Sequence, residues 1–337
     1  MFKNTFKIDS IWYQPNWLCY LLLPFAWCYR FLVFLRYFFY QIGIFETYRS
    51  PIPIIVVGNI TVGGTGKTPL VIWLVDFLRQ HGFKPAVISR GYKAKCSIFP
   101  HQITKEDSAE TVGDEALLIA KRCHCPVIIS PNRVAAVKKL LANKACDIII
   151  SDDGLQHYAL ARDIEIAVID GTRRFGNGFC LPAGPLREPQ KRLEAVDFVV
   201  INGKEDPKEA EYKMQLQPIG FYDFKNQDIT NLHPLELLHD QTVHAVAGIG
   251  NPERFFQTLR DLKIKVIPHP FPDHHDFSSQ DLDFGDAKII VMTEKDAVKC
   301  YRFVDDKLNK KYWVLQVAAK MNQEFGVKLM GKLQLIK

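Results

Sequence analysis

Short apolar runs alternate with amphipathic stretches along most of the chain. The run 52–57 is β-branched and ends at Gly58, which predicts a buried strand, and residues 67–80 carry apolar positions at helical spacing. The alternation continues to residue 202. The expected strands are 52–57, 86–89, 127–130, 147–151, 164–170 and 198–202, and the expected helices are 67–80, 115–122 and 133–141. This order is typical of a mostly parallel α/β sheet with helices on both faces.

The chain is longer than one core usually holds, since it has 337 residues. Residues 203–240 are polar and lack clear periodicity, which predicts a connection to a second domain. A strand at 243–249, a helix at 252–262 and strands near 289–292 and 313–317 predict a smaller α/β unit there. We therefore expect an N-terminal helical segment at 1–45, a core at 46–215 and a C-terminal domain at 216–337.

The stretch 17–45 is rich in aromatic residues and leucine, but Pro24, Arg30 and Arg36 interrupt it. Its longest uncharged run is shorter than the roughly 20 residues of a clean transmembrane helix. The pattern favours a helix that lies in or dips into a bilayer face, with both arginines reaching lipid phosphates. An apolar helix packed on the protein's own core and a single true span remain alternatives.

Composition excludes only a few classes of partner and site. Hydrophobic residues make up 47% and charged residues 24%, as in an ordinary globular protein, and the net charge of +6 suits anionic partners in general. The eight cysteines are scattered, and Cys123-His124-Cys125 lacks a second pair for a zinc site. No basic run alternates with exposed aromatics, so we expect no nucleic-acid partner, and no obligate protein partner is evident.

The strand at 52–57 leads through a glycine-rich loop into the helix at 67–80. Amide groups of such a loop cradle phosphate oxygens, and the helix N-terminus adds a positive dipole. Lys67 is positioned to reach the β- and γ-phosphates of ATP, and Thr68 to ligate Mg²⁺. Thr61 stands where the strict motif has its first glycine. The candidate nucleotide-binding residues are Thr61, Val62, Gly63, Gly64, Thr65, Gly66, Lys67 and Thr68.

A second phosphate-site element is the apolar strand that ends in Asp152 and Asp153. A parallel sheet places this strand end beside the loop of the first strand, where a carboxylate holds Mg²⁺ directly or through water. The two motifs together predict a P-loop protein that uses ATP and Mg²⁺.

Several motifs then occur in a family-specific order, and they resemble the tetraacyldisaccharide 4′-kinase family of the lipid A pathway. They are 57–69 (VGNITVGGTGKTP), 89–92 (SRGY), 113–116 (GDEA), 152–157 (DDGLQH), 181–189 (LPAGPLREP), 273–275 (DHH) and 293–297 (TEKDA). Each motif alone is weak, but jointly they are highly specific and cover about residues 50 to 300. The apolar start also matches the family's membrane-associated helix.

The resemblance implies transfer of the ATP γ-phosphate to the 4′-hydroxyl of a lipid-linked glucosamine disaccharide. It implies a lipid-linked disaccharide 1-phosphate as substrate and an inner-membrane lipid surface as partner. It further implies a location on the cytoplasmic face of a Gram-negative inner membrane, and two α/β domains with the active site in the cleft between them.

A sugar hydroxyl needs a positioned base to accept its proton during phosphoryl transfer. Asp114 is the first candidate, at an expected helix start, and the family's matching aspartate acts together with a histidine of the second domain. His274 is the position we map to that histidine, while the adjacent His275 remains an alternative. A helix-capping role is the structural alternative for Asp114.

Other residues are candidates for supporting roles. Arg187 lies in a proline-punctuated loop, where its guanidinium is expected to stabilise transferred phosphate. Glu115 is a candidate Mg²⁺ ligand, with an exposed helix charge as the alternative. The weaker candidate substrate contacts are Glu188, Gln156, Arg133 and Tyr92.

A membrane-associated regulatory ATPase of the partitioning or cell-division type is the main rival function. Such proteins share the glycine loop and a membrane-binding helix. They also carry a second lysine early in the loop, where this chain has Val62. A non-enzymatic nucleotide-gated module is a second rival, disfavoured by the acid and base candidates outside the loop.

Overall fold

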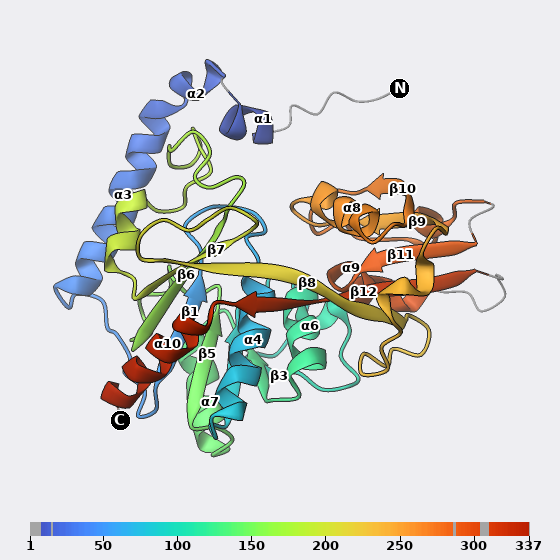
Figure 1. Ribbon diagram of the computed structural model, residues 1–337. Helices are drawn as coiled ribbons and strands as arrows, with labels where there is room; N and C mark the ends of the chain where they lie inside the picture. The colour runs from blue at the N-terminus through green and yellow to red at the C-terminus, as the bar shows by residue number, and fades with distance from the viewer. Residues whose placement is uncertain (1–7, 15, 286–287, 304–309, 337) are drawn as a thin grey trace. The chain divides into compact units, whose positions relative to one another are not determined.

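The computed structural model of the protein describes residues 8–14, 16–285, 288–303 and 310–336. Its contacts divide the chain into two compact units (Figure 1). The first unit comprises residues up to 67, 146–215 and the chain from 321 onward, and the second comprises 68–145 and 216–320.

A parallel sheet forms the centre of the first unit. Its strands are β1 (Ile54–Gly58), β5 (Ile148–Asp152), β6 (Ile164–Asp170), β7 (Phe198–Asn202) and the start of β8 (Glu211–Asp223), in the order β8-β7-β6-β1-β5. Every residue of β1, β5 and β6 is buried, as expected for strands covered on both faces. Val57 is the register partner of Asp152, so the carboxyl ends of β1 and β5 lie side by side.

The C-terminal helix α10 (Gln323–Ile336) returns to this first unit. The ring of Phe325 packs edge-on against Phe198 of β7 and Tyr212 of β8, at centroid distances of 5.2 and 5.4 Å. These aromatic contacts cover the outer strands of the sheet and bury apolar area far from the loops at its carboxyl end.

Three helices, α1 (Ile8–Tyr13), α2 (Leu18–Leu21) and α3 (Leu23–Gln41), begin the chain. Pro24 lies in the first turn of α3, where its missing N–H is not needed, so it starts this helix and does not break it. The Tyr29 hydroxyl donates a hydrogen bond to the Arg187 carbonyl, and the Trp12 indole donates one to the Pro182 carbonyl. These bonds tie the N-terminal helices to the loop 175–191.

Most of the large apolar side chains of α3 are exposed. Ala26 is its buried residue, whereas eight large side chains of α2 and α3 are each between 42% and 65% exposed. They are Tyr20, Leu21, Phe25, Trp27, Phe31, Leu32, Phe34 and Phe38. The expectation that this stretch forms a helix is met, and the alternative of a core helix is wrong. In the part of the chain that the structure describes, no helix combines the length and apolarity needed to cross a bilayer.

One part of the second unit continues directly from the first. Helix α4 (Lys67–Gln80) leads to β2 (Pro85–Ser89), which pairs in parallel with β4 (Val127–Ile129). The short strand β3 (His101–Gln102) pairs antiparallel with β4. Helices α5, α6 and α7 connect these strands, with the bounds Ala109–Val112, Asp114–Cys123 and Arg133–Ala142.

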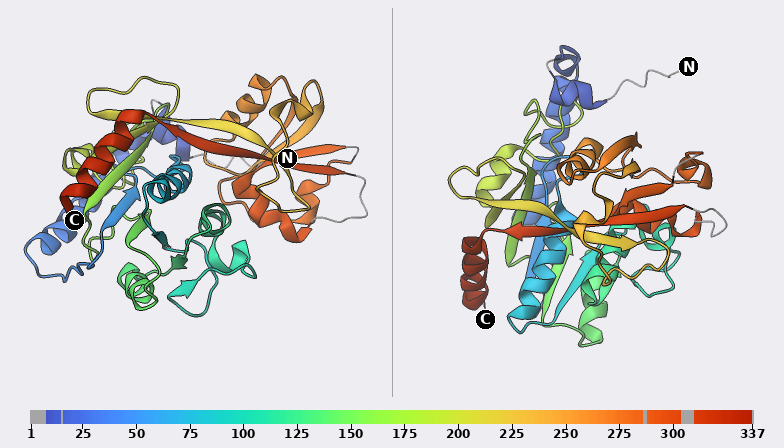
Figure 2. Two further views of the ribbon diagram at one scale, coloured as in Figure 1. Left: turned by 60° about the horizontal axis from the view of Figure 1, so that its bottom comes forward. Right: turned by 45° about the vertical axis from the view of Figure 1, so that its right-hand side comes forward.

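The other part of the second unit is a strand group in the order β10-β9-β11-β12-β8. The bounds are β9 Thr242–Ala247, β10 Lys265–Pro270, β11 Ile289–Thr293 and β12 Lys311–Met321. Alternate residues of β9 and β11 pack toward α8 (Pro252–Asp261) and toward α9 (Glu294–Cys300), which cover opposite faces (Figure 2). Short 3₁₀ helices lie at Gln190–Ala195, Leu235–Leu238, Ser279–Leu282 and Tyr301–Phe303.

The predicted fold class is confirmed, because helices cover mostly parallel strands around a phosphate-loop connection. The segment 203–240, predicted as the connection to a second domain, contains the strand β8 at 211–223, which its lack of clear periodicity did not indicate. Its Pro218 and its many polar, partly exposed positions hid the strand. The domain boundary predicted at 215 stays a prediction, although the chain does pass from one unit to the other between Gln215 and Leu216. The first seven residues of the expected 1–45 segment, like 286–287, 304–309 and 337 of the C-terminal domain, lie outside the described residues.

Candidate active site

The phosphate loop follows β1 as predicted. Thr61 is buried and forms an antiparallel bridge with Leu186, and the Val62 amide donates to the Pro185 carbonyl. The backbone at Thr61 is therefore bridged to another segment, a role for which threonine is well suited and glycine is not needed. Gly63 has a φ of +97°, which favours glycine, and supplies the turn two residues later.

Gly66 shows why the loop needs a glycine before its lysine. Its φ is +95°, and a Cβ there would meet the Asn202 amide nitrogen at 2.2 Å. That amide donates a 2.9 Å hydrogen bond to the Thr65 carbonyl, which fixes the loop against the end of β7. A side chain at Gly66 would break this bond or displace the loop. Lys67 then begins α4, so the helix N-terminus opens at the loop.

One carboxylate at the end of β5 is shared by two cations. Asp153 Oδ1 lies 3.4 Å from Lys67 Nζ, and Asp153 Oδ2 lies 3.2 Å from the Arg187 guanidinium. Burial would raise the pKa of Asp153, but these two charges outweigh it and lower that pKa to about 2. The residue holds a φ of +47°, a strained conformation that points to a functional position. Two cations around one anion leave a positive charge for an anionic ligand.

The loop residues fit a nucleoside triphosphate. The Thr65 hydroxyl and the Asn59 side-chain oxygen are buried without a hydrogen-bond partner among the described residues, which is costly unless a ligand or water satisfies them. Asp152, 1% exposed, and Asp153 supply oxygen atoms, and Mg²⁺ bound with phosphates needs only one or two carboxylates. Thr68 is the second residue of α4 and carries the remaining predicted metal-ligating oxygen.

Two of the predicted substrate contacts instead support this loop region. Glu188 is 2% exposed, and its carboxylate accepts hydrogen bonds from the Tyr158 hydroxyl and from Gln156 Nε2, the latter at 2.9 Å. Gln156 also donates to the Asn59 carbonyl at 3.1 Å. The network joins the segments that carry Asp153 and Arg187. A role for Glu188 or Gln156 as a substrate contact stays a prediction.

A second group of polar residues lies in the second unit, at the start of α6. Gly113 caps this helix with a φ of +90°, and a Cβ there would meet the Tyr92 carbonyl at 2.6 Å. Asp114 occupies the first helical position and is 7% exposed. Its Oδ1 accepts the Glu115 amide at 2.9 Å, while Oδ2 lies 3.0 Å from His274 Nδ1.

Lys295, from the start of α9, completes this group. Its ammonium lies 2.9 Å from Glu115, 3.4 Å from Asp273 and 3.3 Å from His274 Nε2. Burial acts to lower the pKa of Lys295, but the surrounding carboxylates outweigh it and raise that pKa above its ordinary value. An ammonium only donates, so His274 Nε2 must accept and Nδ1 must carry the proton that faces Asp114.

The choice between the two adjacent histidines is settled by their contacts. His274 has a φ of +56°, its carbonyl accepts from Lys93 at 2.9 Å, and its ring meets the Tyr92 ring edge-on at 5.1 Å. His275 points elsewhere, with Nε2 lying 3.3 Å from Asp281. The structure therefore brings His274, and not His275, to Asp114.

The environment of Asp114 keeps it ionised. Burial alone would raise its pKa, but the hydrogen bond with His274 and the charge of Lys295 lower that pKa to about 2. Asp114 is thus a charged acceptor at every physiological pH, oriented by the His274 imidazole. The capping role considered for Asp114 belongs to Gly113, although Asp114 does bind one free amide of the helix start.

The remaining predicted residues fall in different places. Glu115 pairs with Lys295, and its role as a metal ligand stays a prediction. Arg133 is 2% exposed and contacts the Ser130 carbonyl at 3.4 Å, so its guanidinium is buried at the start of α7. Tyr92 is 55% exposed beside His274, where its ring is open to a ligand.

Lys295 and Tyr158 are the residues that sequence reasoning left without a role. Lys295 lies in the motif 293–297, so its position was marked but its partners were not. Tyr158 has no sequence signal, because its importance depends on burial against Glu188.

A glycine loop between a buried parallel strand and a helix, with an acidic strand end alongside, defines a P-loop nucleotide-binding protein. The second unit adds an ionised aspartate that is held by a histidine. The family model described as tetraacyldisaccharide-1-P 4′-kinase matches residues 18–334, and the chain belongs to this family. It is therefore an ATP-dependent kinase, and the partitioning-type ATPase is not supported.

Relatives and a solved structure agree with this assignment. The tetraacyldisaccharide 4′-kinase of Nitrosococcus oceani is 49% identical over 96% of this chain and 93% of the relative. That of Legionella pneumophila (strain Corby) is 50% identical over 95% of each chain. The crystal structure of LpxK from Aquifex aeolicus in complex with ATP matches with a TM-score of 0.77 and 28% identity, covering 94% of this chain and 99% of the other.

Proposed function

We propose that this chain transfers the γ-phosphate of ATP to the 4′-hydroxyl of a tetraacyl glucosamine disaccharide 1-phosphate at a membrane surface. The observation that carries the proposal is the Asp114–His274–Lys295 array. A sugar hydroxyl is a weak nucleophile, and a phosphoryl-transfer enzyme orients it with a positioned carboxylate. The array provides one that stays ionised.

Asp114 is the proposed acceptor of the hydroxyl proton. Phosphoryl transfer has a loose transition state, so the carboxylate need only orient the hydroxyl and take its proton late. A pKa of about 2 is compatible with that task, although it makes Asp114 a weak base in water. His274 holds the carboxylate in place through Nδ1–H, and Lys295 holds the imidazole in that tautomer.

The phosphate loop and the two cations near Asp153 have the complementary task. Backbone amides of 63–67 and the Lys67 ammonium would hold the β- and γ-phosphates, and the Arg187 guanidinium would stabilise charge on the transferred group. Thr68, Asp152 and Asp153 are the proposed Mg²⁺ ligands. When bound, Mg²⁺ neutralises phosphate charge and orients the nucleotide.

The membrane surface is supported by the exposed apolar side chains of α2 and α3. Monomeric proteins rarely leave so many large apolar side chains in one exposed row, and such a row marks a membrane or protein contact. The aromatic content favours the bilayer interface, where a ring is apolar on one side and wet on the other. We place the enzyme on the cytoplasmic face of a bacterial inner membrane, where ATP is available.

The test is incubation of the protein with labelled ATP and a tetraacyl disaccharide 1-phosphate, followed by location of the new phosphate by NMR. Label at the 4′ position is expected, and Lys67→Ala should abolish it while the protein keeps its circular dichroism spectrum. Label at another hydroxyl, or normal turnover in Lys67→Ala, would contradict the proposal.

A further inference from the structure

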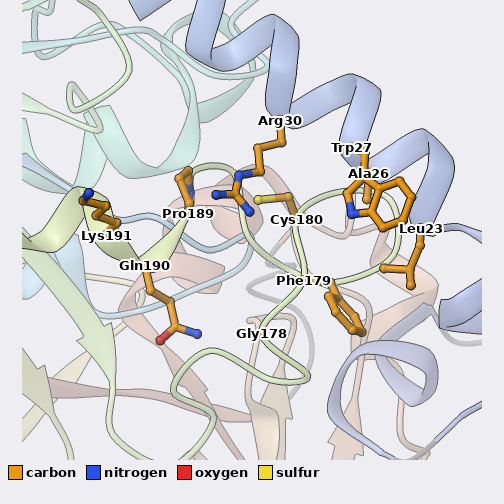
Figure 3. Close-up of a pocket in the computed structure, with 10 residues that line it drawn as sticks. All are labelled: Leu23, Ala26, Trp27, Arg30, Gly178, Phe179, Cys180, Pro189, Gln190 and Lys191. Carbon is orange, nitrogen blue, oxygen red and sulfur yellow. The ribbon is translucent and has the colours of Figure 1, made fainter.

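A cavity of about 260 Å³ lies between α3 and the segment 178–191 of the first unit (Figure 3). Its lining combines apolar side chains with two basic ones. The lining residues are Leu23, Ala26, Trp27, Arg30, Gly178, Phe179, Cys180, Pro189, Gln190 and Lys191. None of these residues is among the proposed nucleotide-binding, metal-binding or catalytic residues.

The cavity is cationic and has no anion of its own. Among the described residues, neither Arg30 nor Lys191 has a hydrogen bond or an ion pair with another side chain. Burial raises the pKa of Cys180 despite the nearby Arg30 charge, so that thiol is neutral. The carboxylate that influences Cys180, Glu188, is already bonded to Tyr158 and Gln156. Figure 3 shows Arg30 reaching from α3 over Cys180.

The other wall is apolar and continues onto an exposed apolar surface. Ala26 and Trp27 lie about one helical turn before Arg30 on α3 and Leu23 lies two turns before it, while Phe179 lines the cavity from the loop (Figure 3). Trp27 is 65% exposed, so its ring extends from the cavity to the row of exposed side chains on the same helix. A ligand that fits must pair an anionic group with a short apolar portion.

We infer that this cavity binds the headgroup of an anionic glycerophospholipid of the bilayer. The lipid phosphate lies between Arg30 and Lys191, and the glycerol and first acyl methylenes lie against Trp27 and Phe179. Arginine is well suited to such a phosphate because its guanidinium binds two oxygens at once. The inference rests on the proposed membrane association, since it supplies the lipid.

The size of the cavity favours the headgroup of a bilayer lipid over the whole kinase acceptor. Pockets that enclose a whole drug-sized ligand run from about 300 to 1,000 Å³, so a cavity of about 260 Å³ is below that range. It has room for one headgroup phosphate and a few carbons. A disaccharide with four acyl chains does not fit inside it.

The test uses vesicles that contain phosphatidylglycerol or only phosphatidylcholine, without ATP or acceptor lipid. Arg30→Gln is compared with Arg36→Gln, which removes the same charge from the same helix outside the cavity. A basic residue near an anionic surface contributes about 1 kcal/mol, or roughly fivefold in binding. We expect Arg36→Gln to lose no more than that, and Arg30→Gln to lose tenfold or more on phosphatidylglycerol alone. Thermal unfolding of both variants confirms that they are folded.

A second measurement uses the fluorescence of the protein with soluble dihexanoyl phosphatidylglycerol. We expect the soluble lipid to quench tryptophan fluorescence saturably in the wild type and in the Arg36→Gln control. This quenching should be lost in Arg30→Gln, although all three proteins contain Trp27. Equal losses of binding to phosphatidylglycerol vesicles in Arg30→Gln and Arg36→Gln would show that only surface charge matters, and would overturn the proposed site. A rise in the acceptor KM of Arg30→Gln in phospholipid-free micelles would assign the cavity to the acceptor and overturn the inference. Because no turnover is measured with vesicles, failure of the proposed kinase reaction would leave phospholipid binding unaffected.

Discussion

The sharpest test of the second-unit array is Asp114→Asn, which keeps the shape of the side chain and removes its charge. The pKa of Asp114 falls from 3.8 to about 2, and at 1.36 kcal/mol per unit this corresponds to about 2 kcal/mol of folding stability. The side chain is only 8% exposed, so solvent screening reduces this figure little. For a unit of 150–250 residues, that loss lowers Tm by about 4–8 °C.

The sign of the pH dependence follows from the lowered pKa. The stabilisation is fully present above the ordinary aspartate pKa near 4 and is lost as pH falls toward 2. The Tm difference between wild type and Asp114→Asn should therefore be constant from pH 5 to 8 and shrink at pH 3. Thermal unfolding followed by circular dichroism at each pH measures it.

The kinetics of Asp114→Asn distinguish a role as proton acceptor from a purely structural role. Loss of a general base typically costs about 10²- to 10⁴-fold, so we expect kcat to fall by that factor while the KM for ATP changes less than threefold. Glu110→Gln is the matched control, because Glu110 lies on the neighbouring helix α5 and forms an exposed ion pair with Lys95. A kcat near that of the wild type, or a parallel loss of nucleotide affinity, would refute the assignment of Asp114 as the acceptor.

Three further predictions follow from contacts described above. Gly66→Ala places a Cβ 2.2 Å from the Asn202 amide nitrogen at a φ of +95°. The affinity for ATP, measured by isothermal titration, should therefore fall by more than tenfold. An unchanged Kd would show that the loop adapts. Lys295→Met should lower kcat more than it raises KM and should change the ¹⁵N shifts of His274 away from the Nδ1–H tautomer, with partial rescue in Lys295→Arg; wild-type shifts in Lys295→Met would dismiss the tautomer argument. Phe31→Glu should reduce sedimentation with vesicles severalfold without changing Tm, because Phe31 is 59% exposed, and full sedimentation would place the membrane contact elsewhere.

Periodicity was sufficient for the first half of the fold because its strands are buried runs. Helix α4 and strands β6 and β7 have the bounds that the apolar pattern predicts. Pattern reasoning failed where strands are partly exposed. The edge strand β10 contains two prolines and exposed side chains, so nothing in its sequence distinguishes it from a loop.

The candidate site likewise contains residues that the sequence predicts and residues that it does not. Lys67 and Asp153 were predictable, because a parallel sheet places the ends of neighbouring strands together. The contact of Lys295 with His274 was not, since it joins residues on separate elements whose packing no local pattern determines. The burial of Glu188 was hidden for the same reason: its partner Tyr158 lies 30 residues away.

The hydrogen bond from Tyr29 to the Arg187 carbonyl means that the N-terminal helices are not a detachable tether. Cutting them off removes a support of the loop that holds Arg187, so a truncated protein would lose turnover even on an acceptor dispersed in detergent. Single substitutions on the exposed surface of α3 would reduce membrane attachment and leave the support of the Arg187 loop intact. On the proposed membrane surface, a displacement of α3 would reach the backbone of Arg187 through this hydrogen bond.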